Sequence, residues 1–128
     1  MTRRLLVVTG ALEAATGAGL LIAPRLVSSL LLGAALNESG AMLVARICGA
    51  ALIVVGIACW STRNEGQSSS ARALMSGLLF YNVVVAVLLV YGWSGLGLRG
   101  IGLWPAALAH LALAVWTFAC LTRRPRQM

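Results

Sequence analysis

The sequence predicts an all-α integral membrane protein, a four-helix bundle with a short interfacial or re-entrant helix between its first and second spans. Hydrophobic residues make up 60% of the 128 residues and charged residues only 10%, against roughly 25% charged residues in an ordinary soluble domain. The mean hydropathy is +0.92. Four segments each hold about the 20 mostly apolar residues that a helix needs to cross a bilayer. These observations exclude a water-soluble globular domain.

The predicted spans are 5–23, 41–61, 73–92 and 101–121. Each is too long for a buried strand and too apolar for the surface helix of a soluble protein. The first span has a basic start, but Glu13 in its middle argues against a cleaved signal peptide. We expect residues 1–128 to form a single transmembrane domain, because the chain is long enough for one small domain and no more.

The three links between the spans differ in character. Residues 24–39 open with Pro24, a favoured first-turn residue, and continue with apolar residues. This pattern predicts a short helix that lies in the membrane interface or dips back into the bundle. Residues 62–70 form a polar loop, and residues 93–100 are rich in glycine and aromatic side chains, as in a tight interfacial turn.

Arginine placement predicts the orientation in the membrane. With four spans, both termini and the 62–70 link share one side. That side holds seven of the ten basic residues, the other side holds two, and Arg46 lies within the second span. Because basic residues concentrate in cytoplasmic segments, both termini are expected in the cytoplasm. The absence of an organelle signal favours a bacterial inner membrane. The seven are Arg3, Arg4, Arg63, Arg72, Arg123, Arg124 and Arg126, and the two are Arg25 and Arg99.

Small residues recur at helical spacing on the first two spans. Such rows let helix backbones approach closely in lipid, where the hydrophobic effect gives helices no net drive to associate. We therefore expect the first two spans to pack tightly against each other. The rows are Gly10, Ala14 and Ala18 on the first span, and Ala45, Gly49 and Gly56 on the second.

One polar or ionisable side chain falls well inside each span: Glu13, Arg46, Asn82 and His110. Such residues are costly in lipid, so they are expected to face the bundle interior and to pair with one another. At a rise of about 1.5 Å per residue, all four lie between the midplane and the outer face. Glu13 and Arg46 are the expected ion pair, and an unpaired Glu13 would instead stay protonated. The simpler reading is that this pair only fixes the packing of two helices.

Candidate functional residues follow from this shared depth. Glu13 and His110 are the candidate catalytic acid and base. Arg46, Asn82, Tyr81 and Trp104 are candidate ligand-binding residues, although interfacial anchoring alone would explain most of the aromatic side chains.

Several chemistries find no support in the sequence. The histidine and cysteine residues form no metal-binding motif, so we expect neither a metal nor a cofactor. No glycine-rich loop follows a strand, which argues against nucleotide binding. The chain contains no aspartate, so a Ser-His-Asp triad is impossible. The ten basic residues are scattered among apolar runs and form no nucleic-acid-binding patch.

Four stretches together resemble the DoxX-like group of small four-helix bacterial membrane proteins. They are a first span with an internal acid (GALEAATGAGLL), a proline-led apolar link (APRLVSSLLLG), a second span that opens on arginine and glycine (ARICGAALIVVGIA), and a fourth span with a central histidine (AALAHLALAVW). The resemblance implies a four-helix bundle with a polar interior. Members of that group include subunits associated with quinone-linked oxidation, and the resemblance carries over no catalytic residue.

Three functions remain open at this stage. The first is a pocket that binds a lipophilic small molecule or quinone, either without changing it or with its transformation by proton transfer, as in isomerisation, cyclisation or epoxide opening. The second is a non-catalytic accessory subunit of a quinone-linked or other membrane complex, with a homo-oligomer or larger assembly and membrane lipids as partners. The third is a small proton-coupled multidrug-type transporter, which the internal acid Glu13 favours and the long 24–39 link and Arg46 disfavour.

Overall fold

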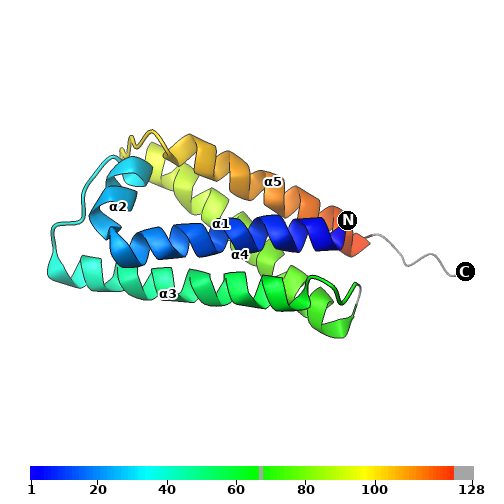
Figure 1. Ribbon diagram of the computed structural model, residues 1–128. Coiled ribbons are helices and arrows are strands. Elements are labelled where there is room, and N and C mark those ends of the chain that lie inside the picture. The colour runs from blue at the N-terminus through cyan, green and yellow to red at the C-terminus, as the bar shows by residue number, and fades with distance from the viewer. Residues whose placement is uncertain (67, 123–128) are drawn as a thin grey trace, which may run out of the picture.

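The computed structural model confirms the all-helical membrane fold (Figure 1). It describes residues 1–66 and 68–122. Four of its helices are long and apolar enough to cross a membrane, and a fifth, shorter helix follows the first. The predicted orientation rests in part on Arg123, Arg124 and Arg126, which lie outside the described residues. The helices are α1 (Thr2–Ile22), α2 (Pro24–Leu32), α3 (Ser39–Thr62), α4 (Ser69–Ser94) and α5 (Leu103–Thr122).

Some helices extend beyond the apolar segments that predicted them. The clearest case is α4, which begins four residues before the predicted start of the third span. The Ser68 side chain accepts a hydrogen bond from the Ala71 backbone N–H at 3.1 Å and so caps the new helix. Its hydroxyl also donates to Glu65 Oε2 at 2.7 Å. Hydropathy marks the apolar part of a helix, whereas its ends are set by capping bonds of this kind.

The 24–39 link forms the short helix that the sequence predicts. Pro24 occupies its first turn, and Gly33 ends it in the left-handed conformation with φ of +76°. Helix α2 lies across one end of the bundle, opposite the end where the N-terminus and the last turn of α5 lie (Figure 1). We refer to these as the α2 end and the terminal end.

Backbone hydrogen bonds fasten α2 to the link between α4 and α5. The N–H of Gly102 donates to the Leu30 carbonyl at 2.8 Å, and the N–H of Arg99 donates to the Leu32 carbonyl at 3.2 Å. These bonds satisfy carbonyls that the end of a helix would otherwise leave unpaired. A Cβ at Gly100 would overlap the Leu31 carbonyl, so the close fit requires glycine there.

Helices α1 and α3 form one tightly packed antiparallel pair, as the small-residue rows predict. A Cβ built on Gly17 would lie 2.5 Å from the Gly49 carbonyl oxygen, and one built on Gly56 would lie 2.9 Å from the Gly10 carbonyl oxygen. The two backbones therefore touch at two levels. Gly17 belongs to this contact although it was not in the predicted row.

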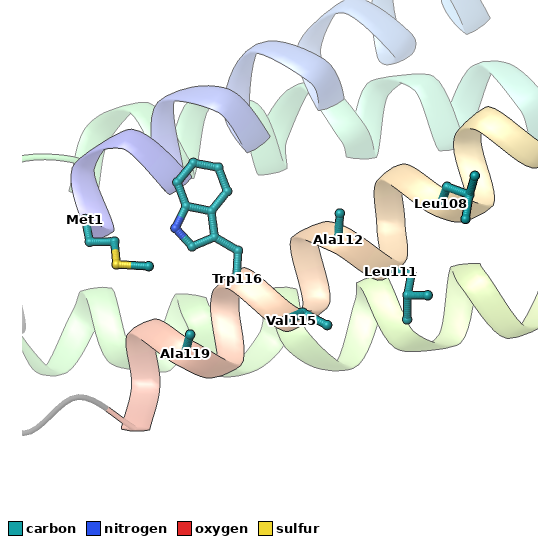
Figure 2. Close-up of a pocket in the computed structure, with 7 residues that line it drawn as sticks. All are labelled: Met1, Leu108, Leu111, Ala112, Val115, Trp116 and Ala119. Atoms are coloured by element: carbon teal, nitrogen blue, oxygen red, sulfur yellow. The ribbon is translucent and has the colours of Figure 1, made fainter.

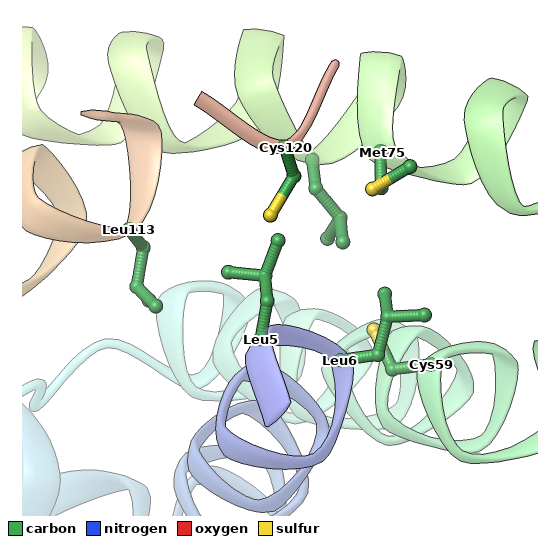
Figure 3. Packing of buried hydrophobic residues seen from close by; sticks show 7 residues of the cluster. Leu5, Leu6, Cys59, Met75, Leu113 and Cys120 are labelled. Atoms are coloured by element: carbon green, nitrogen blue, oxygen red, sulfur yellow. The ribbon is translucent and has the colours of Figure 1, made fainter. Parts of the chain in front are cut away.

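Helices α4 and α5 form the second pair, and a hydrophobic cluster joins it to the first pair at the terminal end (Figure 3). Figure 3 shows Leu5 and Leu6 of α1 extending into the space between Cys59 of α3 and Cys120 of α5. The cysteines are free thiols and act here as small apolar side chains. The remaining buried members of the cluster are Met75, Leu78 and Leu113.

The outward faces of α3, α4 and α5 are covered with exposed apolar side chains. In water such continuous apolar surface would drive aggregation, whereas in lipid it is the expected surface of a spanning helix. Large apolar residues that are more than half exposed include Ile47, Val54 and Ile57 of α3, Phe80, Val87 and Leu88 of α4, and Leu108, Val115 and Phe118 of α5.

The contact between α1 and α3 can be tested with a single methyl group. We expect Gly17→Ala to lower the free energy of unfolding by about 1–3 kcal/mol, because the added Cβ meets backbone that cannot move aside. Denaturant titration in detergent micelles measures this change. The matched control is Gly77→Ala in α4, where a Cβ meets no atom within 4 Å. It should leave stability unchanged or raise it by up to about 1 kcal/mol. Equal effects of both variants would contradict the packing.

Candidate functional site

Two adjoining cavities lie between the α1–α3 pair and the α4–α5 pair. The smaller, of about 190 Å³, is lined by residues of α1, α4 and α5, among them Glu13. The larger, of about 500 Å³, extends toward α2 and is lined almost wholly by apolar side chains. The residues common to the two cavities are Thr16, Tyr81, Ala106 and His110. Polar groups thus gather where the cavities meet.

Glu13 is held by a tyrosine of the facing helix. Its side chain is only 4% exposed, and the Tyr81 hydroxyl donates to Glu13 Oε2 at 3.2 Å. Tyr81 comes from α4 and Glu13 from α1, so this bond joins the two helix pairs. A carboxyl group buried in an apolar interior needs such a partner, because an unsatisfied polar group there is costly.

A second polar pair lies beside the first, and its geometry fixes the histidine tautomer. Asn82 is fully buried, and its Nδ2 donates to the Leu78 carbonyl at 2.7 Å. Its Oδ1 therefore faces His110 Nδ1, which lies 2.8 Å away. Because an amide oxygen only accepts, Nδ1 must carry the hydrogen. In the neutral ring, Nε2 then keeps its lone pair.

The free nitrogen of His110 faces open space. His110 lines both cavities, and Nδ1 is the ring nitrogen with a hydrogen-bond partner among the described residues. Nε2 is not among the fully enclosed polar atoms without a partner, so it has surface exposed within the cavities. The ring also packs edge-on against Tyr81, with centroids 5.6 Å apart and an interplanar angle of 81°. Tyr81 therefore contacts both ionisable side chains.

The ends of the cavity system are closed by different means. At the α2 end, Val27, Leu30 and Leu31 line the larger cavity, and the backbone bonds between α2 and the α4–α5 link hold them in place. Toward the terminal end, the hydrophobic cluster shown in Figure 3 fills the interior. The polar cluster is thus enclosed along the bundle axis, and the nearest lipid lies beside it.

Arg46 does not join this cluster. It lies one turn before Gly49, which packs against Gly17 and Leu20 of α1. This register places Arg46 about two turns, roughly 10 Å, from the level of Glu13, and its side chain is exposed. The predicted ion pair with Glu13 is therefore not formed, and the tyrosine hydroxyl takes its place. Depth along a helix can be counted from the sequence, whereas the face a residue occupies depends on how the helices pack.

Trp104 also lies outside the two cavities. It is 43% exposed and packs edge-on against Trp93 with ring centroids 5.4 Å apart. Its other neighbours are apolar residues on the outward side of α4 and α5, including Val87 and Val90. This position is typical of an aromatic side chain that anchors a helix at the membrane interface.

Most of the apolar residues that line the cavities were not predicted as site residues, and two further sets of unpredicted residues bear directly on the site. Thr16 lines both cavities, and its position three residues after Glu13 on the same helix face is a signal that was available in the sequence. The second set is the α2 side chains. Their contact with the cavity could not be read from the sequence, because α2 could equally have packed on the membrane surface.

The donor set is suited to hydrogen bonding and proton transfer. Glu13 can donate or accept a proton, His110 Nε2 can accept one, and the two line the same small cavity. Within the described residues, no three His, Cys, Asp or Glu side chains lie close enough together to hold a metal ion.

Comparison with known proteins yields no relative: the chain matches no family model, no curated protein and no solved structure. The resemblance to the DoxX-like group therefore stays a prediction. The fold and the site define a multi-pass, all-helical membrane protein with a polar cluster enclosed in its apolar interior.

The histidine tautomer can be measured directly, because His110 is the single histidine of the chain. In protein labelled with ¹⁵N-histidine, at mildly alkaline pH, we expect a protonated Nδ1 and an unprotonated Nε2. Asn82→Leu removes the acceptor at Nδ1 and should shift the signals toward the usual mixture of tautomers. The control Asn37→Leu changes an exposed amide in the link after α2 and should leave the spectrum unchanged. A protonated Nε2 in the wild-type protein would contradict the geometry.

Proposed function

We propose that this protein binds a lipophilic small molecule within the bundle and transforms it by proton transfer. One observation carries the proposal: side chains of three helices bring an acid, a phenol and a histidine together at the wall of an otherwise apolar cavity. If the polar side chains served only to hold the helices together, their hydrogen bonds would suffice and no cavity beside them would be needed. Ligand sites in proteins combine an apolar lining with a few convergent polar groups in this way.

The cavities favour a ligand with a bulky apolar body and one polar end. The larger cavity, of about 500 Å³, would hold the apolar body. The polar end would lie at the junction, within reach of Tyr81 and His110. A small quinone, a cyclic ketone, an epoxide or an isoprenoid derivative has this shape and polarity.

Proton transfer is the chemistry that the residues support. Without a cation beside it, Glu13 is expected to favour its neutral acid form in the apolar interior, so it would act as the proton donor. His110 Nε2 would accept the proton that the ligand gives up. Tyr81 would orient the acid and Asn82 would orient the base. In acid–base sites a neighbouring hydrogen-bonding side chain commonly orients the reacting group in this way. Isomerisation and cyclisation each require only such a pair, whereas epoxide opening by addition also needs a nucleophile, such as water or a hydroxyl group of the ligand.

The ligand would enter from the bilayer. Leu12 and Ala109, which line the smaller cavity, are exposed on the outside of α1 and α5. The α2 end is fastened by backbone bonds, so a path from the aqueous phase would have to break them. A lipophilic molecule is concentrated in the membrane and reaches the cavity sideways between α1 and α5.

The bound molecule can be sought by native mass spectrometry of the detergent-purified protein. We expect a discrete lipophilic adduct on the wild-type protein and its loss in Glu13→Gln and in His110→Ala, because each variant removes one polar contact. The controls are Glu38→Gln and Arg46→Gln, which change exposed residues outside the cavities and should retain the adduct.

Four results would count against this function. If no form of the protein carried an adduct, or if a polypeptide persistently co-purified with it, the accessory-subunit alternative would be favoured. If all four variants lost the adduct, binding would not depend on the polar cluster. Proton-coupled uptake that Glu13→Gln abolishes would favour the transporter instead.

We also propose that the protein lies in a bacterial inner membrane with both termini in the cytoplasm, as the arginine distribution predicts. Green fluorescent protein fused to the C-terminus should then fluoresce, while alkaline phosphatase at the same position should be inactive. Phosphatase fused after Gly97, in the link between α4 and α5, should be active and provides the control. The reverse pattern would invert the proposed orientation.

A further inference from the structure

An apolar groove lies along the face of α5 that is turned away from the polar cluster, and Figure 2 shows the residues that line it. It is shallow and open, with a volume of about 600 Å³, and its lining is almost entirely apolar. Leu108, Leu111, Ala112 and Val115 form its floor on α5. Figure 2 shows the Trp116 ring standing between α5 and the first turn of α1, with Met1 beside it. None of these residues takes part in the proposed reaction.

The length of the groove matches one leaflet of a bilayer. It follows α5 from Leu108 to Ala119, which is about 16 Å along a helix axis. The hydrocarbon core of a bilayer is about 30 Å thick, so each leaflet contributes about 15 Å. An acyl chain that begins at the terminal end would therefore fill the groove to the middle of the membrane.

Two arginines stand at the membrane-surface end of the groove. Arg3 and Arg4, together with Val7 and Val8, line a neighbouring cavity of about 370 Å³. Trp116 belongs to both this cavity and the groove, and so connects them. Among the described residues, no carboxylate lines either cavity, and the first turn of α1 contains no acidic residue. The local charge is therefore positive and is strengthened by the positive end of the helix dipole.

Trp116 adds an independent sign that a polar acceptor belongs here. Its indole Nε1 is enclosed and has no hydrogen-bond partner, the only such side-chain atom in the part of the chain that the structure describes. A buried donor without an acceptor is costly, and one in a folded protein calls for an explanation. Because Trp116 lines both the groove and the neighbouring cavity, a ligand that fills them and carries a carbonyl oxygen would supply the missing acceptor.

We propose that this groove binds an anionic phospholipid, with its phosphate on Arg3 and Arg4 and one acyl chain along α5. Arginine is well suited to the phosphate, because its planar fork donates two parallel hydrogen bonds. The apolar floor of the groove is suited to the acyl chain of the lipid and not to a charged group. The groove is separate from the cavity of the proposed function, so the lipid-binding proposal and the proposed function can be refuted independently.

The test is lipid competition in native mass spectrometry of the full chain, with equal amounts of phosphatidylglycerol and phosphatidylcholine. We expect the wild-type protein to prefer phosphatidylglycerol. Each arginine near an anionic lipid surface contributes about a fivefold preference, so Arg3→Gln with Arg4→Gln should reduce the preference by about 25-fold. The control is Arg25→Gln with Arg46→Gln, which removes the same charge from exposed positions near the α2 end and should keep the preference.

A second variant tests the apolar part of the site. Ala112→Trp places a large ring on the groove floor while Arg3 and Arg4 remain, and it should reduce the occupancy of both lipids. Equal binding of the two lipids by the wild-type protein would overturn the proposal. It would also be overturned if the two double arginine variants lost the preference for phosphatidylglycerol to the same extent. A dimer that Ala112→Trp abolishes, with the lipid preference unchanged, would also overturn it and assign the groove to a second copy of the chain.

Discussion

The close contact between α1 and α3 is the constraint on which the rest of the site depends. Glycines at two levels bring the two backbones together, and Glu13 lies on α1 between those levels, at the edge of the contact face. Its side chain is therefore directed inward, toward α4, and not into lipid. A larger residue in either contact would separate the helices and move the carboxyl group away from Tyr81, because backbone atoms cannot shift as a flexible side chain can.

The polar cluster forms where the two helix pairs meet. Within the second pair, the hydrogen bond between Asn82 and His110 joins α4 to α5 and orients the imidazole. Between the pairs, the bond from Tyr81 to Glu13 joins α4 to α1. In an apolar medium each bond is expensive to leave unmade, so together they select one rotation of α4 relative to its neighbours. The same bonds that specify the packing also hold an acid and a base beside an open cavity.

Helix α5 separates two environments. One face carries Ala106, His110 and Leu113 toward the interior, and the other carries the apolar floor of the outer groove. The inner cavity is enclosed at both ends of the bundle, while the outer groove opens to lipid along its length. Because its two faces differ in this way, a 20-residue helix with one histidine lines both the polar inner cavity and the apolar outer groove.

The sequence by itself determined the four spans, the short helix after Pro24 and the close packing of the first two spans. Hydropathy, proline position and small-residue spacing are properties of a linear chain, and lipid leaves few alternatives for an apolar segment of 20 residues. It also placed Glu13, Asn82 and His110 at comparable depth, because rise per residue is fixed. Only the tertiary structure decided that Glu13 pairs with Tyr81 while Arg46 points outward, since which face of a helix meets its neighbour depends on how whole helices rotate and pack.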